Sequence, residues 1–262
     1  MKNVITLSLT IVLIAACNSP KKKTEENTEQ STEVATSEIT LTKAPDSPQF
    51  PEASLKFRES TVQNITDSTY SVDYDFVVDN YELGAQTTDA ATRGLVNSGK
   101  GQHIHFIVNN GPYSAHYLPG VSNELEAGNY VVLAFLSRSY HESVKSQGAY
   151  YVENLNVDTD KKEVDLSTPH MFFSRPKGTY KGEDAKKLML DFYLVNADLS
   201  ANGNNIRATI NGEEFLIDEW VPYYIGGLPM GEVNIKLEFL DSEGNLVDSP
   251  FNSVERVVTL TE

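Results

Sequence analysis

The sequence contains a single cysteine, Cys17, so the chain cannot close an internal disulfide, and its stability must come from packed cores. Basic residues are also scarce, because 21 Lys and Arg stand against 37 Asp and Glu, which gives a formal net charge of −16 at pH 7. An acidic chain is repelled by nucleic-acid phosphates, so we expect no nucleic-acid partner. The sequence has no G-x-S-x-G elbow, no H-E-x-x-H pair and no Walker loop, and we therefore expect a protein that is not an enzyme.

The N-terminus has the pattern of an export signal. Lys2 precedes an apolar run from Val4 to Ala16 that is too short to span a bilayer permanently. The run ends in Ile14-Ala15-Ala16-Cys17, which resembles the lipobox of bacterial lipoproteins. The resemblance implies that residues 1–16 are a signal peptide, that the thiol of Cys17 is lipidated, and that the lipid anchors the chain to a membrane. Asn18 replaces the Asp associated with inner-membrane retention in proteobacteria, so the expected location is the outer membrane of a bacterial cell envelope.

Residues 17–52 are rich in Lys, Glu, Thr, Ser and Pro and hold almost no aromatic residues. Such a segment buries too little apolar surface to offset the entropy of ordering, so we expect a disordered tether that carries the lipid at Cys17. The remaining chain, from residue 53, is long enough for two small domains.

Alternation of apolar and polar residues dominates this remainder, for example over 70–79 and 233–239. A period of two is typical of half-buried strands in antiparallel sheets, and no segment has the periodicity of an amphipathic helix. Short strands separated by Gly, Asn and Asp turns favour β-sandwiches. The predicted fold class is therefore all-β.

An internal repeat divides the folded part into two copies. Each copy has an Asn-Gly pair after an apolar run, at Asn110-Gly111 and Asn211-Gly212, and this pair is typical of type I′ hairpins. The matched segments follow in the same order in both copies: Asp75–Leu83 with Asp191–Leu199, Ile107–Gly111 with Ala208–Gly212, and Tyr117–Pro119 with Trp220–Pro222. The repeat predicts two tandem immunoglobulin-like antiparallel β-sandwiches over 53–168 and 169–262, with an insertion at 85–102 in the first.

The lipobox, the acidic spacer and the paired sandwiches together resemble surface lipoproteins of Bacteroidetes-type bacteria. This resemblance implies a cell-envelope protein and indicates no particular activity.

Four of the five histidines, His103, His105, His116 and His141, lie in the first copy. On a strand, His103 and His105 project from one face and Ile104 from the other, so we expect two solvent-facing imidazoles that form half of a metal site. A third ligand from His116 or His141 would complete a shell for zinc or copper. The alternative is that these are ordinary surface or hydrogen-bonded histidines.

The repeat bears on this choice. The second copy has Asn204 and Ile206 at the positions aligned with His103 and His105, so the fold itself does not require histidine there. Three segments, Gly128–Val132, Ser139–His141 and Gly148–Val152, are similar to the closing strands of CopC-like periplasmic copper-binding domains. That similarity implies a copper-ligand position for His141, although the chain lacks the acidic-Gly pair that precedes the histidine in those domains.

Aromatic residues near the two hairpins are a further candidate site: Tyr113, Tyr117, Trp220, Tyr223 and Tyr224. Exposed aromatics on sandwich loops bind sugars or proteins, whereas buried ones close the end of a sandwich. The sequence thus leaves two expectations open. One is a membrane-anchored binding or interaction protein with a protein or glycan partner, and the other is a lipoprotein that binds copper or zinc through the histidines of its first domain.

Overall fold

Strands dominate residues 38–262, the part of the chain that the computed structural model describes. Cys17, the predicted signal peptide 1–16 and the predicted tether up to residue 37 lie outside the described residues. Within residues 38–262, no helix is both long and apolar enough to span a membrane. Helical structure in this part consists of α1 (Ala90–Arg93), which falls in the expected insertion, and a 3-10 turn at Gly182–Lys186.

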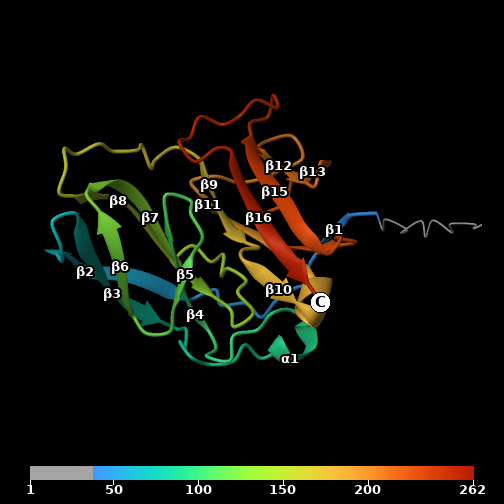
Figure 1. The fold of residues 1–262 in the computed structure, drawn as a ribbon, viewed down its shortest axis with the longest axis horizontal. Coiled ribbons are helices and arrows are strands. Elements are labelled where there is room, and N and C mark those ends of the chain that lie inside the picture. Colours follow the sequence, from blue (N-terminus) through green and yellow to red (C-terminus); the bar gives the residue numbers. More distant parts are fainter. Residues whose placement is uncertain (1–37) are drawn as a thin grey trace, which may run out of the picture. The chain divides into compact units, whose positions relative to one another are not determined.

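The first sandwich consists of two sheets (Figure 1). The three-stranded sheet has the order β2-β3-β6, and the four-stranded sheet has the order β5-β4-β7-β8. Tyr74 and Phe76 of the first sheet pack against Ile104, Phe106 and Val132 of the second in one core. The strands are β2 (Ser54–Asn64), β3 (Thr69–Asp79), β4 (His103–Val108), β5 (Ser114–His116), β6 (Gly120–Glu126), β7 (Gly128–Ser137) and β8 (Tyr150–Val157).

The second sandwich also has two sheets, with the orders β1-β14-β11-β9 and β10-β16-β15-β12-β13. Leu190 and Phe192 of β11 face Ile206, Ile235 and other residues of the second sheet in a separate core. All its strand pairs are antiparallel except β10 with β16. The strands are β1 (Thr40–Lys43), β9 (His170–Arg175), β10 (Thr179–Lys181), β11 (Leu188–Val195), β12 (Asn205–Ile210), β13 (Glu213–Ile217), β14 (Tyr223–Gly226), β15 (Gly231–Leu240) and β16 (Val254–Thr261). The prediction of tandem antiparallel β-sandwiches is confirmed.

The expected tether ends earlier than residue 52. Strand β1 pairs with β14 at the edge of the second sandwich, from Thr40 opposite Gly226 to Lys43 opposite Tyr223. The side chain of Ile39 is buried in the core of that sandwich. The prediction of disorder up to residue 52 is wrong because backbone pairing, to which composition gives no clue, orders this polar stretch.

The two hairpins follow the repeat with one shift. In the second copy, Asn211 and Gly212 have φ values of +47° and +92°, as a type I′ turn requires. In the first copy the two residues with positive φ are Asn109 (+46°) and Asn110 (+57°), so the turn begins one residue before the predicted Asn110-Gly111 pair. Asn109 is therefore equivalent to Asn211, and its side chain accepts a hydrogen bond from the next strand in the same way.

This shift corrects the alignment of the histidines. His103 and His105 correspond to Asn205 and Arg207, and the core residue Ile104 corresponds to Ile206. The outward position that holds His105 in the first sandwich thus holds a half-exposed arginine in the second.

The two sandwiches share a third apolar cluster. Ile107, Leu133 and Phe135, on the outer face of the β4–β7 sheet, pack against Phe172 and Tyr193 on β9 and β11. Asn110 also joins the two, because its amide accepts from the backbone N–H of Phe173 at 2.7 Å and donates to the carbonyl oxygens of Met171 and Phe251. The outer face of β4, which was predicted to face solvent, is therefore an internal surface.

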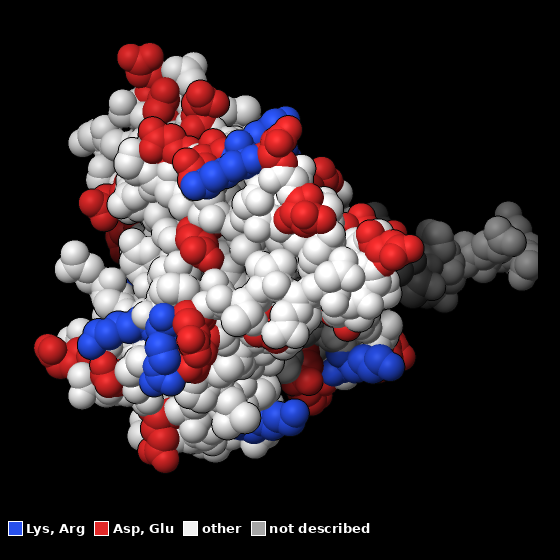
Figure 2. Space-filling view, turned by 90° about the vertical axis from the view of Figure 1, so that its left-hand side faces the viewer, with Lys and Arg blue, Asp and Glu red and all other residues white. Residues whose placement is uncertain are grey.

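Charged side chains on the face drawn in Figure 2 are interspersed, with basic groups next to acidic ones. Two exposed ion pairs of this kind link β2 with β3: Lys56 with Asp79 at 2.8 Å, and Arg58 with Asp75 at 2.6 Å. Pairs at such exposed positions contribute little to stability.

Candidate metal centre

Strand β4 presents two histidines on one face. His103 and His105 alternate with Ile104 and Phe106, which belong to the core of the first sandwich. The two imidazoles therefore point away from that core, and their Nε2 atoms lie 2.9 Å apart. Both side chains are fully buried, which corrects the expectation that they face solvent. The second sandwich covers them, and the hydroxyl of Ser174 on β9 lies 3.4 Å from Nδ1 of His105.

The third imidazole comes from the connection between β7 and β8. His141 occupies a tight turn with a φ of +68°, and its Nδ1 lies 3.0 Å from Nε2 of His103 and 3.4 Å from Nε2 of His105. A positive φ is uncommon for a residue other than glycine, and such backbone strain is concentrated at functional sites. Three ring nitrogens from two segments of the chain thus meet at one point.

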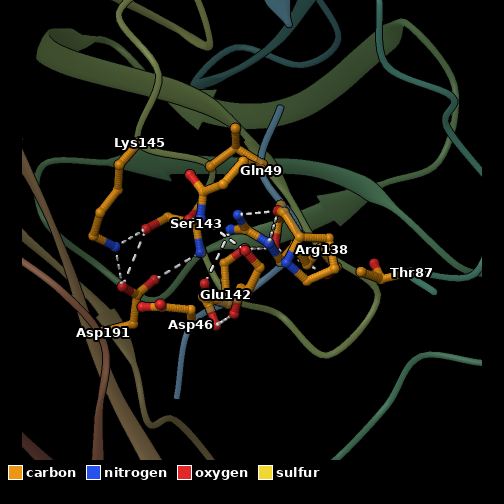
Figure 3. Close-up of polar contacts among 12 residues, drawn as sticks. Asp46, Gln49, Thr87, Arg138, Glu142, Ser143, Lys145 and Asp191 are labelled. Carbon is orange, nitrogen blue, oxygen red and sulfur yellow. Dashed lines mark hydrogen bonds and ion pairs between the residues drawn. The ribbon is translucent and has the colours of Figure 1, made fainter. Parts of the chain in front are cut away.

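A polar network fixes the turn that carries His141 (Figure 3). Arg138 forms an ion pair with Glu142 at 3.0 Å, and both side chains are almost completely buried. In Figure 3, Ser143 and Lys145 point toward Asp191 of β11, and Lys145 Nζ lies 2.6 Å from its carboxylate. This network connects the turn to the second sandwich.

The segment before β2 reinforces the same turn. The hydroxyl of Ser47 donates to Glu142 at 2.7 Å, and the guanidinium of Arg138 donates to the carbonyl oxygen of Pro48 at 2.6 Å. Residues expected to be part of the tether therefore help to position His141.

Contacts within the site determine the tautomer of His103. Its Nδ1 lies 2.8 Å from the carbonyl oxygen of Gly101, which can only accept, so Nδ1 carries the hydrogen and Nε2 has a free lone pair. A backbone carbonyl that orients the far nitrogen of an imidazole is typical of metal-binding histidines. Gly101 has a φ of +83°, and a Cβ there would meet a backbone oxygen at 2.2 Å, so this position requires glycine.

All three imidazoles are neutral near pH 7. Burial lowers the pKa of His103 to about 4 and that of His141 to about 2, and nearby Arg175 lowers both further in the same direction. Burial, followed by the neighbouring His103, also holds the pKa of His105 well below its usual range. Neutral imidazole is the form that binds metal ions.

The spacing of the nitrogens suits a metal ion. An ion bound tetrahedrally at about 2.0–2.1 Å from imidazole nitrogens holds those nitrogens about 3.3 Å apart. The observed separations of 2.9, 3.0 and 3.4 Å are close to this value. His103, His105 and His141 can therefore hold one Zn²⁺ or copper ion after small adjustments of their side chains.

His116, the fourth predicted ligand, is not part of the cluster. It lies opposite Ile104 in the β4–β5 pair, and directly opposed residues in antiparallel strands point to the same face. Its ring therefore lies on the Ile104 side of the sheet, opposite to His103, and its Nε2 contacts the hydroxyl of Ser114 at 2.8 Å. Of the two third ligands that the sequence left open, the structure brings in His141.

The aromatic candidates divide between the cluster and structural roles. The Tyr113 ring stacks on His105, with centroids 3.5 Å apart, and the ring centroid of Tyr117 lies 5.0 Å from that of His103. Trp220 donates its indole N–H to the carbonyl oxygen of Phe192 and packs against both sandwiches. Tyr223 is buried in β14, so it is not available to a partner. Tyr224, next to it, is half-buried, and the ammonium of Lys187 lies 4.0 Å from its ring centroid.

Two cationic residues beside the site were absent from the predictions. Arg175 and Lys177 act electrostatically on all three imidazoles, although they belong to the second copy. The sequence of β7 gave one indication of the contact between the sandwiches that brings these cations close to the histidines. Strand β7 is apolar without interruption from Val131 to Leu136, and a strand without alternation is buried on both faces.

No protein-family model matches the sequence, and no curated protein is significantly similar to it. Among solved structures, the chain is similar to fibronectin(III)-like modules of CbhA from Clostridium thermocellum, with 11% identity and a TM-score of 0.28 over 78% of this chain and 94% of the other. It is also similar to domains 4 and 5 of the S-layer protein SbsC, with 13% identity and a TM-score of 0.21 over 86% of this chain and 98% of the other. At these scores, no functional conclusion follows from either likeness.

Proposed function

We propose that this chain is a lipid-anchored, non-enzymatic metal-binding protein of the bacterial cell envelope that holds one zinc or copper ion through His103, His105 and His141. The observation that carries the proposal is the convergence of three neutral imidazole nitrogens at 2.9, 3.0 and 3.4 Å. Imidazole suits both zinc and copper.

Hydrogen bonding among the three rings does not account for this arrangement. Nε2 of His103 offers one lone pair, yet Nε2 of His105 and Nδ1 of His141 both lie within 3.0 Å of it. If both neighbours carried hydrogens, they would compete for that lone pair. If one did not, two lone pairs would face each other at close range. A cation in the centre removes the conflict because all three lone pairs can then point at it.

The location rests on the sequence. The lipobox that ends at Cys17 supports anchoring by a lipid, and Asn18 supports the outer membrane. The partners we propose are therefore a membrane, reached through the lipid, and the metal ion, with no nucleic acid.

Metal stoichiometry of the full chain tests the proposal. We expect one equivalent of Zn²⁺ or Cu²⁺ per chain after equilibration at micromolar concentrations and removal of free metal. His141→Asn should abolish this retention, because Asn tolerates the positive φ of the turn but leaves two imidazoles. The matched control is His116→Ala, which removes a histidine of the same domain from outside the cluster and should retain the full equivalent. No bound metal in the wild-type protein, or equal loss in both variants, would contradict the proposal.

A second candidate function is the capture of a protein or glycan. A cavity of about 480 Å³ lies beside the turn of His141, and Gln49, Phe50, Lys145 and Trp220 are among its lining residues. Aromatic rings together with a few polar groups are typical of small-ligand pockets. Binding on a glycan or peptide array that Gln49→Ala weakens, without a change in metal content, would favour this function.

A further inference from the structure

Tyr113 lies directly against the three imidazoles. Its ring is nearly parallel to that of His105, at an interplanar angle of 11°, and its hydroxyl oxygen lies 3.3 Å from Nδ1 of His141. The residue is only 4% exposed. The distance of 3.3 Å equals the spacing of about 3.3 Å between neighbouring ligand atoms around a tetrahedral ion bound at about 2.0–2.1 Å. The hydroxyl therefore lies at ligand spacing from the His141 nitrogen.

The surroundings of the site are cationic. The side chains of Arg175 and Arg256 are buried, and Lys177 Nζ lies 4.0 Å from the ring centroid of Tyr113. Within residues 38–262 no carboxylate lies within ion-pair distance of any of these three cations. Arg256 donates instead to backbone carbonyl oxygens, and Nε of Arg175 is buried without a hydrogen-bond partner.

Buried charge of one sign is costly unless a charge of the opposite sign lies close by. Three neutral imidazoles offer none, so a divalent ion would add two positive charges to a region that already contains three cations. A phenolate at Tyr113 would supply the missing negative charge next to the ion, on the ring that the Lys177 ammonium already contacts. Tyr117 is less suited to this role, because its hydroxyl already pairs with that of Ser98 at 2.7 Å.

We propose that Tyr113 is the fourth ligand of the metal ion, bound through its phenolate oxygen, so that a divalent ion, Zn²⁺ or Cu²⁺, is held in a three-histidine, one-tyrosinate shell. The O–H bond of Tyr113 breaks as the ion binds, its proton passes to solvent, and the oxygen lone pair forms the bond to the metal. The ion keeps its oxidation state, and no electron is transferred. This inference rests on the proposed metal-binding function and names its fourth ligand, with Cu²⁺ as the probe ion in the test.

The test is the visible spectrum of the full chain loaded with one equivalent of Cu²⁺. A copper-bound phenolate gives a charge-transfer absorption in the visible region, and resonance Raman excitation in that band enhances tyrosinate vibrations. We expect both signals in the wild-type protein. In Tyr113→Phe both should be lost, while the electron paramagnetic resonance spectrum should still show Cu²⁺ coupled to imidazole nitrogens.

The matched control is Tyr117→Phe, which removes the hydroxyl of the other tyrosine that contacts the histidines and should leave the band unchanged. The copper affinity of Tyr113→Phe should fall by at least the ~10–100-fold that loss of an outer-shell partner causes. The hydroxyl of Tyr113 contacts only His141 in the described residues, so this variant should fold normally.

Two failures can be told apart. Bound Cu²⁺ with no charge-transfer band, or with a band that persists in Tyr113→Phe, would overturn the assignment of Tyr113 and leave the three-histidine site in place. No bound copper or zinc in the wild-type protein would overturn the metal site itself.

Discussion

The side chain of Asn110 offers a sharp test of how the two sandwiches are held together. It forms three hydrogen bonds to the second sandwich: one accepted from the N–H of Phe173 and two donated to the carbonyl oxygens of Met171 and Phe251. Asn110→Gly removes all three and keeps the turn, because the equivalent residue of the second hairpin is Gly212, with a φ of +92°.

The magnitude follows from these bonds. Each contributes about 0.5–1.5 kcal/mol, and the buried N–H of Phe173 loses its acceptor, so we expect the free energy of unfolding to fall by about 2–4 kcal/mol. At about 2–4 °C per kcal/mol for a body of this size, the melting temperature should drop by roughly 4–16 °C.

The assay is urea and thermal unfolding of the full chain, followed by circular dichroism. The control is Gly212→Asn, which places the same side chain in a hairpin where an added Cβ meets no atom within 4 Å. We expect this control to lower the free energy of unfolding by no more than about 1 kcal/mol, which is the strain of an asparagine at a φ of +92°. A loss below about 1 kcal/mol for Asn110→Gly would show that the side chain does not hold the interface.

Three further predictions concern the site and the interface. Gly101→Ala should weaken metal binding by about 10–100-fold, because the added Cβ would displace the carbonyl that orients His103. The control Gly99→Ala, which has open space around it, should bind metal as the wild type does. Equal affinities of the two variants in a calorimetric titration would refute this. Phe135→Ala should lower the free energy of unfolding by about 3–5 kcal/mol, because the ring is fully buried between the sandwiches. The control Leu216→Ala should change it little, because Leu216 is 68% exposed. Similar urea midpoints for the two variants would contradict the interface. The metal-free protein should lose stability as the pH falls from 6.5 to 4, because the pKa of His103 is lowered to about 4 and the unfolded chain therefore takes up the proton first. With about 1.36 kcal/mol per pKa unit, His103 alone contributes at most roughly 3 kcal/mol, and urea unfolding that shows no loss over this pH range would refute the burial of a neutral ring.

The sequence was sufficient to predict strands that have one apolar and one polar face. Strand β3 alternates between buried residues such as Tyr74 and outward ones such as Asp75, so its position and its inward face were predicted correctly. For β4, alternation correctly placed His103 and His105 on one face opposite Ile104. A period of two defines which residues share a face, but it does not reveal what lies against that face.

Contacts between segments that are distant in the sequence could not be predicted from it. That β4 is covered by the second sandwich depends on Phe172 and Tyr193, which lie far along the chain. The choice of His141 over His116 depends on the β4–β5 register and on a turn fixed by Asp191 of the other sandwich. Neither the register nor the partner of that turn leaves a periodic signal in the sequence.

The interface between the copies is also asymmetric. One face of the first copy meets a different face of the second, and a head-to-tail contact of this type would add copies without end if both faces recurred on every copy. They do not recur. On β7 of the first copy the outward residues are apolar: Val131, Leu133 and Phe135. At the equivalent positions, β15 of the second copy has the polar residues Asn234, Lys236 and Glu238, in the same order.

The opposite face also differs between the copies. Tyr193 and Val195 of the second copy correspond to Val77 and Asp79 of the first, where Asp79 forms an exposed ion pair with Lys56. The two copies are therefore not interchangeable in this contact, although both are built on the same fold: a copy in the other's place would bring charged side chains to an apolar surface.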